Sequence, residues 1–176
     1  YDIALWNWYF GTKNRVNFFE LHFLSSPKSI NMKKFFNPYS SESVRDFALL
    51  LLRLSVGALL ITHGFPKFQK LISGNEILFA SVFGLSPTVS MTMAMLAEFF
   101  CAAMVFMGVF TRLAAIPVII TMLVIVFKIH GSDPLSNKEM PLLYLISYLT
   151  IFLCGPGKYS VDYFLYNSAG KGQRAR

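Results

Sequence analysis

Two charged residues stand inside long apolar stretches of this sequence, where a charge needs a partner. Arg53 lies in the run DFALLLLRLSVGALLITHGFP, and Glu98 lies near the middle of the apolar run that follows Ser86-Pro87. Placing either charge at the centre of a bilayer costs about 3 kcal/mol on insertion scales. Counted from the ends of the two runs, their depths overlap. We therefore expect a buried Arg53–Glu98 ion pair in which guanidinium and carboxylate satisfy each other.

The expected pair has two interpretations. As a structural contact, it would only lock two helices together. As a functional contact, Arg53 and Glu98 would line a polar pocket that orients a quinone or relays a proton. A third arrangement, in which the two side chains do not meet, stays open.

A second set of polar residues gathers where the apolar runs end. His63 and Lys67 close the first run. His130 ends the third run, and Glu139 opens the fourth. A compact bundle can bring these ends to one mouth, so we predict a candidate ligand or partner site there.

The outer cluster also has alternatives. Its residues could cap helices and form interfacial hydrogen bonds, or they could contact a quinone or a redox partner. Two imidazoles and one carboxylate could in principle bind iron, zinc or copper, but they are scattered along the chain without diagnostic spacing. We assign no metal.

The elements that must position these residues are membrane-spanning helices. The chain is 55% apolar and 14% charged, whereas soluble domains carry roughly 25% charged residues. Runs of about 20 apolar residues match the thickness of a bilayer. We therefore predict an all-α integral membrane protein built as a four-transmembrane-helix bundle. The predicted spans are Asp46 to Pro66, Thr88 to Phe110, Leu113 to His130 and Glu139 to Cys154.

Local signals mark where these spans begin and end. Ser40 or Ser41 can cap the first span, and Gly64 with Pro66 marks its end. Ser86-Pro87 is the start signal of the second span. The fourth span is short, roughly 16 residues, so we expect the bilayer to thin around it or neighbouring helices to cover it.

The connection from Lys67 to Pro87 is too long for a turn and carries an apolar cluster after Gly74-Asn75. About ten residues cannot cross a bilayer, so we predict an interfacial or re-entrant helix after the first span.

The distribution of charge sets the expected orientation. The formal net charge of +7 is spread over short connections and both ends of the chain, which argues against nucleic-acid binding. The positive-inside rule places both termini in the cytoplasm.

The two ends of the chain differ from the middle. Met32, followed by Lys33-Lys34, makes a natural start for a membrane protein, so residues 1–31 are expected to be a non-native, disordered or interfacial leader. Residues 32–166 would form the membrane domain. The small, basic segment 167–176 is expected to be a disordered tail.

The order of these residues resembles the DoxX family of small membrane proteins, whose relatives include the DoxD subunit of thiosulfate:quinone oxidoreductase. The resemblance covers about residues 44 to 166. It rests on Arg53 and Gly57, His63-Gly64-Phe65-Pro66-Lys67, Gly84, Ala97-Glu98, Gly108-Val109-Phe110-Thr111-Arg112, His130-Gly131 and Gly155-Pro156-Gly157-Lys158-Tyr159-Ser160-Val161-Asp162.

The resemblance implies a four-helix membrane fold in the bacterial cytoplasmic membrane and an association with quinone-linked or thiol redox systems. An enzymatic role, as an oxidoreductase subunit, is implied by the resemblance alone. The sequence has no haem-attachment C-x-x-C-H, no paired cysteines and no dinucleotide-binding glycine fingerprint, so no cofactor is evident. Electrons would pass through a quinone or a partner protein.

Two hypotheses follow. In the first, the chain is a quinone-interacting subunit of a redox complex, with Arg53 and Glu98 lining the site and the outer cluster at its entrance. In the second, it is a non-catalytic membrane scaffold or anchor for another complex. In both, its partners are the lipid bilayer and a membrane complex or oligomer.

Overall fold

The computed structural model describes residues 41–74 and 76–173 of the chain, with side chains as far as residue 168. Every regular element in this part is a helix. The elements are α4 (Glu42–Ile72), α5 (Pro87–Met95), the π-helical turn η1 (Leu96–Cys101), α6 (Ala102–Met107), α7 (Thr111–Val124), the π-helical turn η2 (Ile125–Ile129), α8 (Leu135–Cys154) and α9 (Val161–Gln173).

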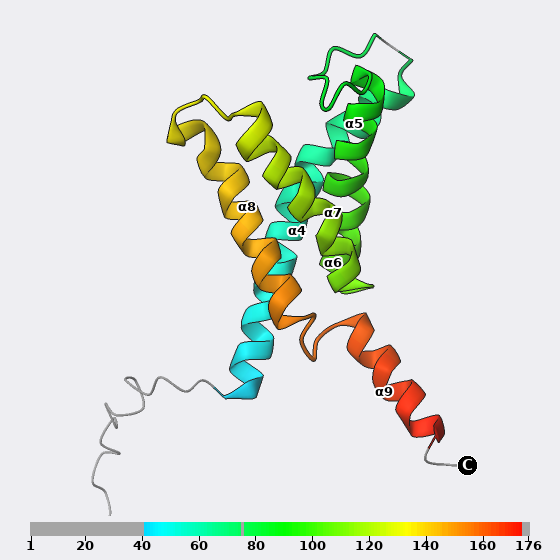
Figure 1. The fold of residues 1–176 in the computed structure, drawn as a ribbon. Helices are drawn as coiled ribbons and strands as arrows, with labels where there is room; N and C mark the ends of the chain where they lie inside the picture. The colour runs from blue at the N-terminus through cyan, green and yellow to red at the C-terminus, as the bar shows by residue number, and fades with distance from the viewer. Residues whose placement is uncertain (1–40, 75, 174–176) are drawn as a thin grey trace, which may run out of the picture. The chain divides into compact units, whose positions relative to one another are not determined.

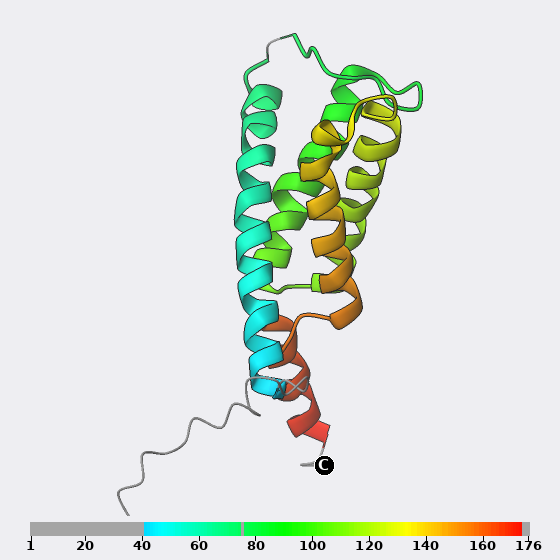
Figure 2. The same cartoon turned by 90° about the vertical axis from the view of Figure 1, so that its left-hand side faces the viewer.

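Four long helical rods lie side by side in the described part of the chain (Figures 1 and 2). They are α4, the continuous helix α5–η1–α6, the continuous helix α7–η2, and α8. α4 packs on α5, η1 and α6, while α7 packs on α6 and α8. Successive rods run in opposite directions, and α9 leaves at the end where α4 begins.

The rods approach closely because small residues face one another in the core. Ala102, Val105, Ala115 and Val118 are fully buried. A Cβ atom at Gly64 would lie 2.6 Å from the backbone nitrogen of Phe99, so only glycine allows α4 to sit directly on η1. This contact fixes the height at which the two helices meet.

The predicted starts of the first two helices are confirmed. The Ser41 hydroxyl accepts a hydrogen bond from the Val44 amide at 3.4 Å, and Ser86 caps α5 ahead of Pro87 in the same way. Each start depends on a side chain and an amide three residues later, so the signal lies wholly within the local sequence.

The predicted end of the first helix is wrong. α4 continues through Gly64 and Pro66 to Ile72, because the residues beyond the proline have partners on the next rod. Lys67 bonds to Glu98, and the ring of Phe68 stacks on that of Phe99 at 5.4 Å. These contacts stabilise the last turns of α4 despite the missing proline amide.

The segment after α4 is not the helix that we predicted, and its interfacial or re-entrant placement stays a prediction. Residues 76–86 form an irregular loop with a turn at Phe83 and Gly84, both of which have positive φ. The Val82 amide donates to the hydroxyl of Ser90 on α5 at 3.2 Å, which ties the loop to that helix.

The last two helices are longer than predicted. α8 begins at Leu135, four residues before the predicted start, so it has 20 residues. α9 includes residues 167–173, which we expected to be disordered. The proposed leader, residues 1–31, lies outside the described residues.

Two helices of the described part are long and apolar enough to cross a membrane. They are Pro87–Met107, with 21 residues, and Thr111–Ile129, with 19 residues.

Candidate functional site

A buried ion pair joins α4 to η1. The Lys67 ammonium group, one turn before the end of α4, donates to Oε2 of Glu98. The Glu98 residue is only 3% exposed. The two side chains meet because Gly64, one turn before Lys67, lets η1 lie against α4.

Two cavities share this ion pair. The first, of ≈ 350 Å³, has an almost wholly apolar lining from the 76–86 loop, α5, α7 and η2. The second, of ≈ 410 Å³, is more open and lies among α4, η2 and α8. Both cavities are lined by Lys67, Glu98, Ile125 and His130. An ion pair and an imidazole therefore lie where an apolar cavity meets a more polar one.

His130 is held from the loop side. Its Nδ1 lies 2.8 Å from Oδ2 of Asp133, and the Asn137 side chain donates to the same oxygen at 3.2 Å. These hydrogen bonds, first of all the one with His130, hold the pKa of Asp133 below its usual value. Asp133 is therefore a carboxylate at neutral pH.

His63 on α4 and Tyr144 on α8 both line the second cavity. Their rings meet edge to face with centroids 6.1 Å apart. His63 therefore joins the cluster through α8 rather than through the ion pair.

Both π-helical turns lie at the junction of the cavities. Glu98 is the third residue of η1, and the His130 amide closes η2 by donating to the Ile125 carbonyl at 2.9 Å. π-helical turns are rare and occur often at functional sites. Their place here is a second indication of a site, independent of the charges.

The expected Arg53–Glu98 ion pair is wrong. Arg53 donates to the carbonyl oxygens of Pro156 at 2.6 Å and Tyr159 at 2.7 Å, in the α8–α9 connection. The error was one of depth, because Glu98 packs at the height of Gly64, about 16 Å farther along α4 than Arg53 at 1.5 Å per residue. Lys67, on the correct turn of α4, takes the carboxylate instead.

A comparison with protein families decides what this domain is. The DoxX family matches residues 48–131, which run from α4 to the loop after η2 and include Arg53, Lys67, Glu98 and His130. This part of the chain belongs to the DoxX family. No curated protein and no solved structure matched the chain. The family and the two long apolar helices together indicate a membrane protein.

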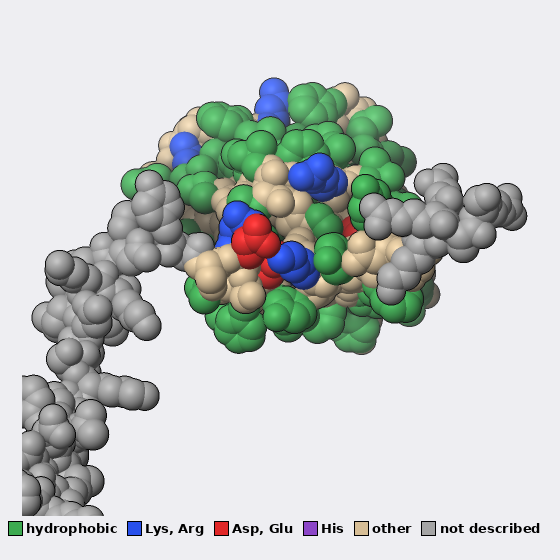
Figure 3. All heavy atoms as spheres, turned by 90° about the horizontal axis from the view of Figure 1, so that it is seen from below, with side chains coloured by type: hydrophobic (Ala, Val, Ile, Leu, Met, Phe, Trp, Pro, Cys, Tyr) green, Lys and Arg blue, Asp and Glu red, His purple; other side chains and the backbone are tan. Residues whose placement is uncertain are grey.

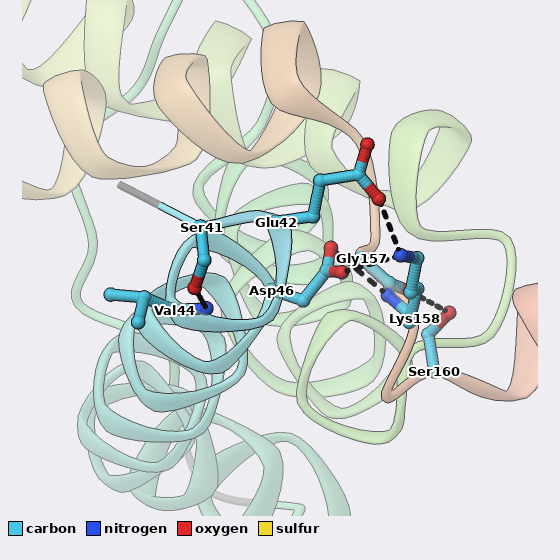
Figure 4. A network of polar contacts seen from close by, with 7 residues as sticks. All are labelled: Ser41, Glu42, Val44, Asp46, Gly157, Lys158 and Ser160. Carbon is cyan, nitrogen blue, oxygen red and sulfur yellow. Dashed lines mark hydrogen bonds and ion pairs between the residues drawn. The ribbon is translucent and has the colours of Figure 1, made fainter. Parts of the chain in front are cut away.

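The opposite end of the DoxX protein carries a separate charged network (Figure 4). Lys158 donates to Glu42 at 2.8 Å and lies 3.6 Å from Oδ2 of the buried Asp46. The hydrogen bond lowers the pKa of Glu42 and raises that of Lys158. Figure 3, which views this end, shows charged side chains near the middle of the visible face and hydrophobic ones around them.

Asp162 links this end to α7. Its carboxylate accepts from the amides of Phe110 and Thr111 at 2.7 and 2.8 Å and from the Thr111 hydroxyl at 2.8 Å. It therefore caps the start of α7 from a distant part of the chain.

The predicted site of the DoxX domain is assembled only in part. His63, Lys67 and His130 meet at the second cavity, whereas Glu139 is exposed and lines neither cavity. The cavity face of α8 repeats at helical spacing and leaves Glu139 on another side. That face consists of Ser136, Asn137, Met140, Pro141 and Tyr144.

Sequence reasoning missed Asp133, Asn137 and Tyr144. Asp133 had a usable signal, because it follows His130 by three residues after the helix break at Gly131. Tyr144 had none beyond its place on a helix. In the described part of the chain, no three His, Cys, Asp or Glu side chains are close enough to hold a metal ion.

Proposed function

We propose that this DoxX protein is a quinone-interacting subunit of a redox complex in the bacterial cytoplasmic membrane. One observation supports this most: the almost wholly apolar cavity of ≈ 350 Å³ ends at Lys67, Glu98 and His130. Ligand sites of this kind bury an apolar body and orient it with a few polar groups. A quinone has both parts, a polar ring and an apolar tail.

In this proposal the tail occupies the apolar cavity and the ring oxygens face the polar junction. The loop residues Phe79, Val82 and Phe83 would cover the tail, since they line that cavity. The more open second cavity gives the ring a route to the aqueous side. The quinone would carry the electrons, and a partner protein would exchange them.

The membrane arrangement that fits this function has four spans and both termini in the cytoplasm. The four rods support it, because each exposes apolar side chains at helical spacing toward its surroundings. Soluble monomers rarely expose such continuous apolar faces. Examples are Val44, Phe47 and Leu51 on α4, Leu96 and Phe100 on η1, Leu113, Ile116, Ile120 and Leu123 on α7, and Leu143, Ile146 and Leu153 on α8.

Binding of a photoreactive short-chain quinone to the purified full chain in detergent tests the proposal. Crosslinks located by mass spectrometry should fall on the helices and loop that line the apolar cavity, and excess decylubiquinone should suppress them. Lys67→Met and Glu98→Gln should weaken the labelling strongly. The matched control is Lys70→Met, which removes a lysine from the same helix at a position that lines neither cavity.

The alternative function is a non-catalytic membrane scaffold for another complex. The exposed side chains of Phe164, Leu165 and Tyr166 on α9 favour it, because they offer a surface to a partner. Purification of the native complex separates the two functions. If the complex contains no bound quinone and the labelling is unsaturable and unchanged by Lys67→Met, the scaffold is the better description.

A further inference from the structure

The state of His130 determines which form of ring the junction can bind. Asp133 is a carboxylate, so it can only accept a hydrogen bond from the imidazole. The hydrogen of neutral His130 must therefore lie on Nδ1, which faces Oδ2 of Asp133 at 2.8 Å. The other ring nitrogen, Nε2, is left with a lone pair.

Nε2, which carries the lone pair, lies on the edge of the imidazole away from Asp133. His130 lines both cavities, whereas Asp133 lines neither. The edge of the imidazole that Asp133 does not occupy is thus the edge available to a ligand. The Asp133–His130 contact sets the hydrogen-bonding character of that edge without touching a ligand itself.

The other polar groups at the junction add a further acceptor. The Lys67 ammonium group, the strongest donor present, already donates to Glu98 and lies 3.4 Å from the His63 carbonyl oxygen. The Glu98 carboxylate can only accept. With neutral His130, the junction therefore presents two acceptors to a ring that enters, Nε2 of His130 and the Glu98 carboxylate, while two of the three Lys67 donors face protein oxygens.

We propose that this junction binds the dihydroxy form of the ring, a quinol, in preference to the quinone, and that Asp133 is the positioning residue that sets this preference. A quinol hydroxyl donates to Nε2 of His130, which a quinone carbonyl cannot do. Asp133 acts only through the imidazole. This inference rests on the proposed function, because it assumes that a quinone-type ring enters the cavity.

The experiment measures affinities of the purified full chain under anaerobic conditions by calorimetry. The probes are decylubiquinol, its dimethyl ether and decylubiquinone, which share one tail but differ in hydroxyl hydrogens. We expect the wild type to bind the quinol about fivefold more tightly than either other probe, the effect of one hydrogen bond. Asp133→Ala should bring the three affinities together.

A matched control and a spectroscopic readout distinguish positioning from general damage. Lys138→Ala removes a neighbouring cation that interacts with Asp133, lines neither cavity and keeps the His130–Asp133 contact, so the quinol preference should remain. Nitrogen NMR of labelled histidine, with signals assigned by their loss in His130→Gln, should show hydrogen on Nδ1 in the wild type. In Asp133→Ala it should move to Nε2.

Each contrary result has its own meaning. Equal affinities for the three probes in the wild type, or an unchanged preference and tautomer in Asp133→Ala, overturn the inference and leave the proposed function standing. If none of the three probes binds, the proposed function fails, and the preference fails with it.

Discussion

Arg53 is a buried charge whose hydrogen-bond partners are not carboxylates. It is 1% exposed, and its two terminal nitrogens donate to carbonyl oxygens of the α8–α9 connection. Gly108 lies against the guanidinium, at a distance where a Cβ atom would be 2.9 Å from its carbon. The Asp162 carboxylate is close enough to interact with it electrostatically. Arg53 thus organises the end of the bundle opposite the cavities.

Arg53 and Glu98, both buried charges, should therefore contribute independently to the free energy of unfolding. In a double-mutant cycle, Lys67→Met and Glu98→Leu should couple, because each alone leaves the other's charge without its partner. Arg53→Leu and Glu98→Leu should add, since they lie about 16 Å apart along the bundle. Arg53→Leu alone should lower the free energy of unfolding by about 3 kcal/mol, as expected for charge-assisted hydrogen bonds.

Thermal and denaturant unfolding in detergent measure all members of these cycles. Ser55→Ala is the control, because its hydroxyl is exposed on the same helix and bonds only to the Leu51 carbonyl. Coupling between Arg53 and Glu98 of more than about 0.5 kcal/mol would contradict the separation of the two sites.

At the scale of elements, the start of α7 depends on α9. Phe110 has a left-handed backbone with φ of 44°, and no residue next to α7 caps it by a side chain. Asp162, on the first turn of α9, supplies the missing acceptor. This carboxylate at a helix N-terminus also interacts favourably with the helix dipole.

Asp162→Ala should lower the free energy of unfolding by about 1–2 kcal/mol, the usual loss when a helix cap is removed. Hydrogen exchange should rise at the Phe110 and Thr111 amides, which lose their acceptor. Asn167→Ala, an exposed position on the same helix, is the control and should leave both unchanged. Continued protection of the two amides would show that α7 begins without this cap.

The contact between the start of α4 and the α8–α9 connection makes stability depend on pH. The pKa of Glu42 is lowered, so its pair with Lys158 stabilises the fold above about pH 4.3 and this stabilisation is lost as pH falls through the folded pKa. The pKa of Lys158 is raised, so its contribution is present below about pH 10.4 and is lost as pH rises through the folded pKa.

Glu42→Gln should therefore reduce the fall in melting temperature between about pH 7 and pH 3, relative to wild type. The difference should be small and should shrink at high salt, because both side chains are largely exposed and screened. Glu76→Gln, outside this network, is the control. Identical acid profiles for wild type and Glu42→Gln would mean that the pair contributes nothing measurable.

Helix boundaries that depend on local sequence signals were predicted correctly, whereas those that depend on long-range contacts were not. The caps at Ser41 and Ser86 were predicted, because cap and amide are three residues apart. Pro66 misled, because the contacts that extend α4 past it come from η1. The apolar cluster in the 76–86 loop misled as well, because its side chains line a cavity instead of forming a helix.

The candidate site shows the same limit. Its polar members His63, Lys67 and His130 were predicted, because charged and polar residues at the ends of apolar runs stand out in the sequence. Their partners could not be assigned, since a difference of a few helical turns decided whether Glu98 met Arg53 or Lys67. Tyr144 has no local signal that separates it from the other aromatic residues.

At the scale of the whole molecule, the proposed four spans predict a definite topology. Reporters fused after Arg112 and after Lys171 should be cytoplasmic, and one after Ser73 should be external. The basic residues Arg45, Arg112 and Lys158 lie on the proposed cytoplasmic side, and the cavities open on the other. An external C-terminus would contradict the count of four spans. The proposed side of the membrane on which the cavities open would then be wrong as well.

The two π-helical turns imply that the register of this bundle rests on single residues. Each holds one residue more than an α-helical path of the same length would need, and one residue corresponds to about 100° of helical rotation. Loss of Phe99 or Phe100 would therefore let η1 become an ordinary α-turn, while Ala102 and Val105 beyond it kept their places in the core. If η1 became an α-turn without losing a residue, these two side chains would instead rotate by about 100° relative to the helix before them. A single codon thus separates a bundle with these turns from one with plain helices and the same packing.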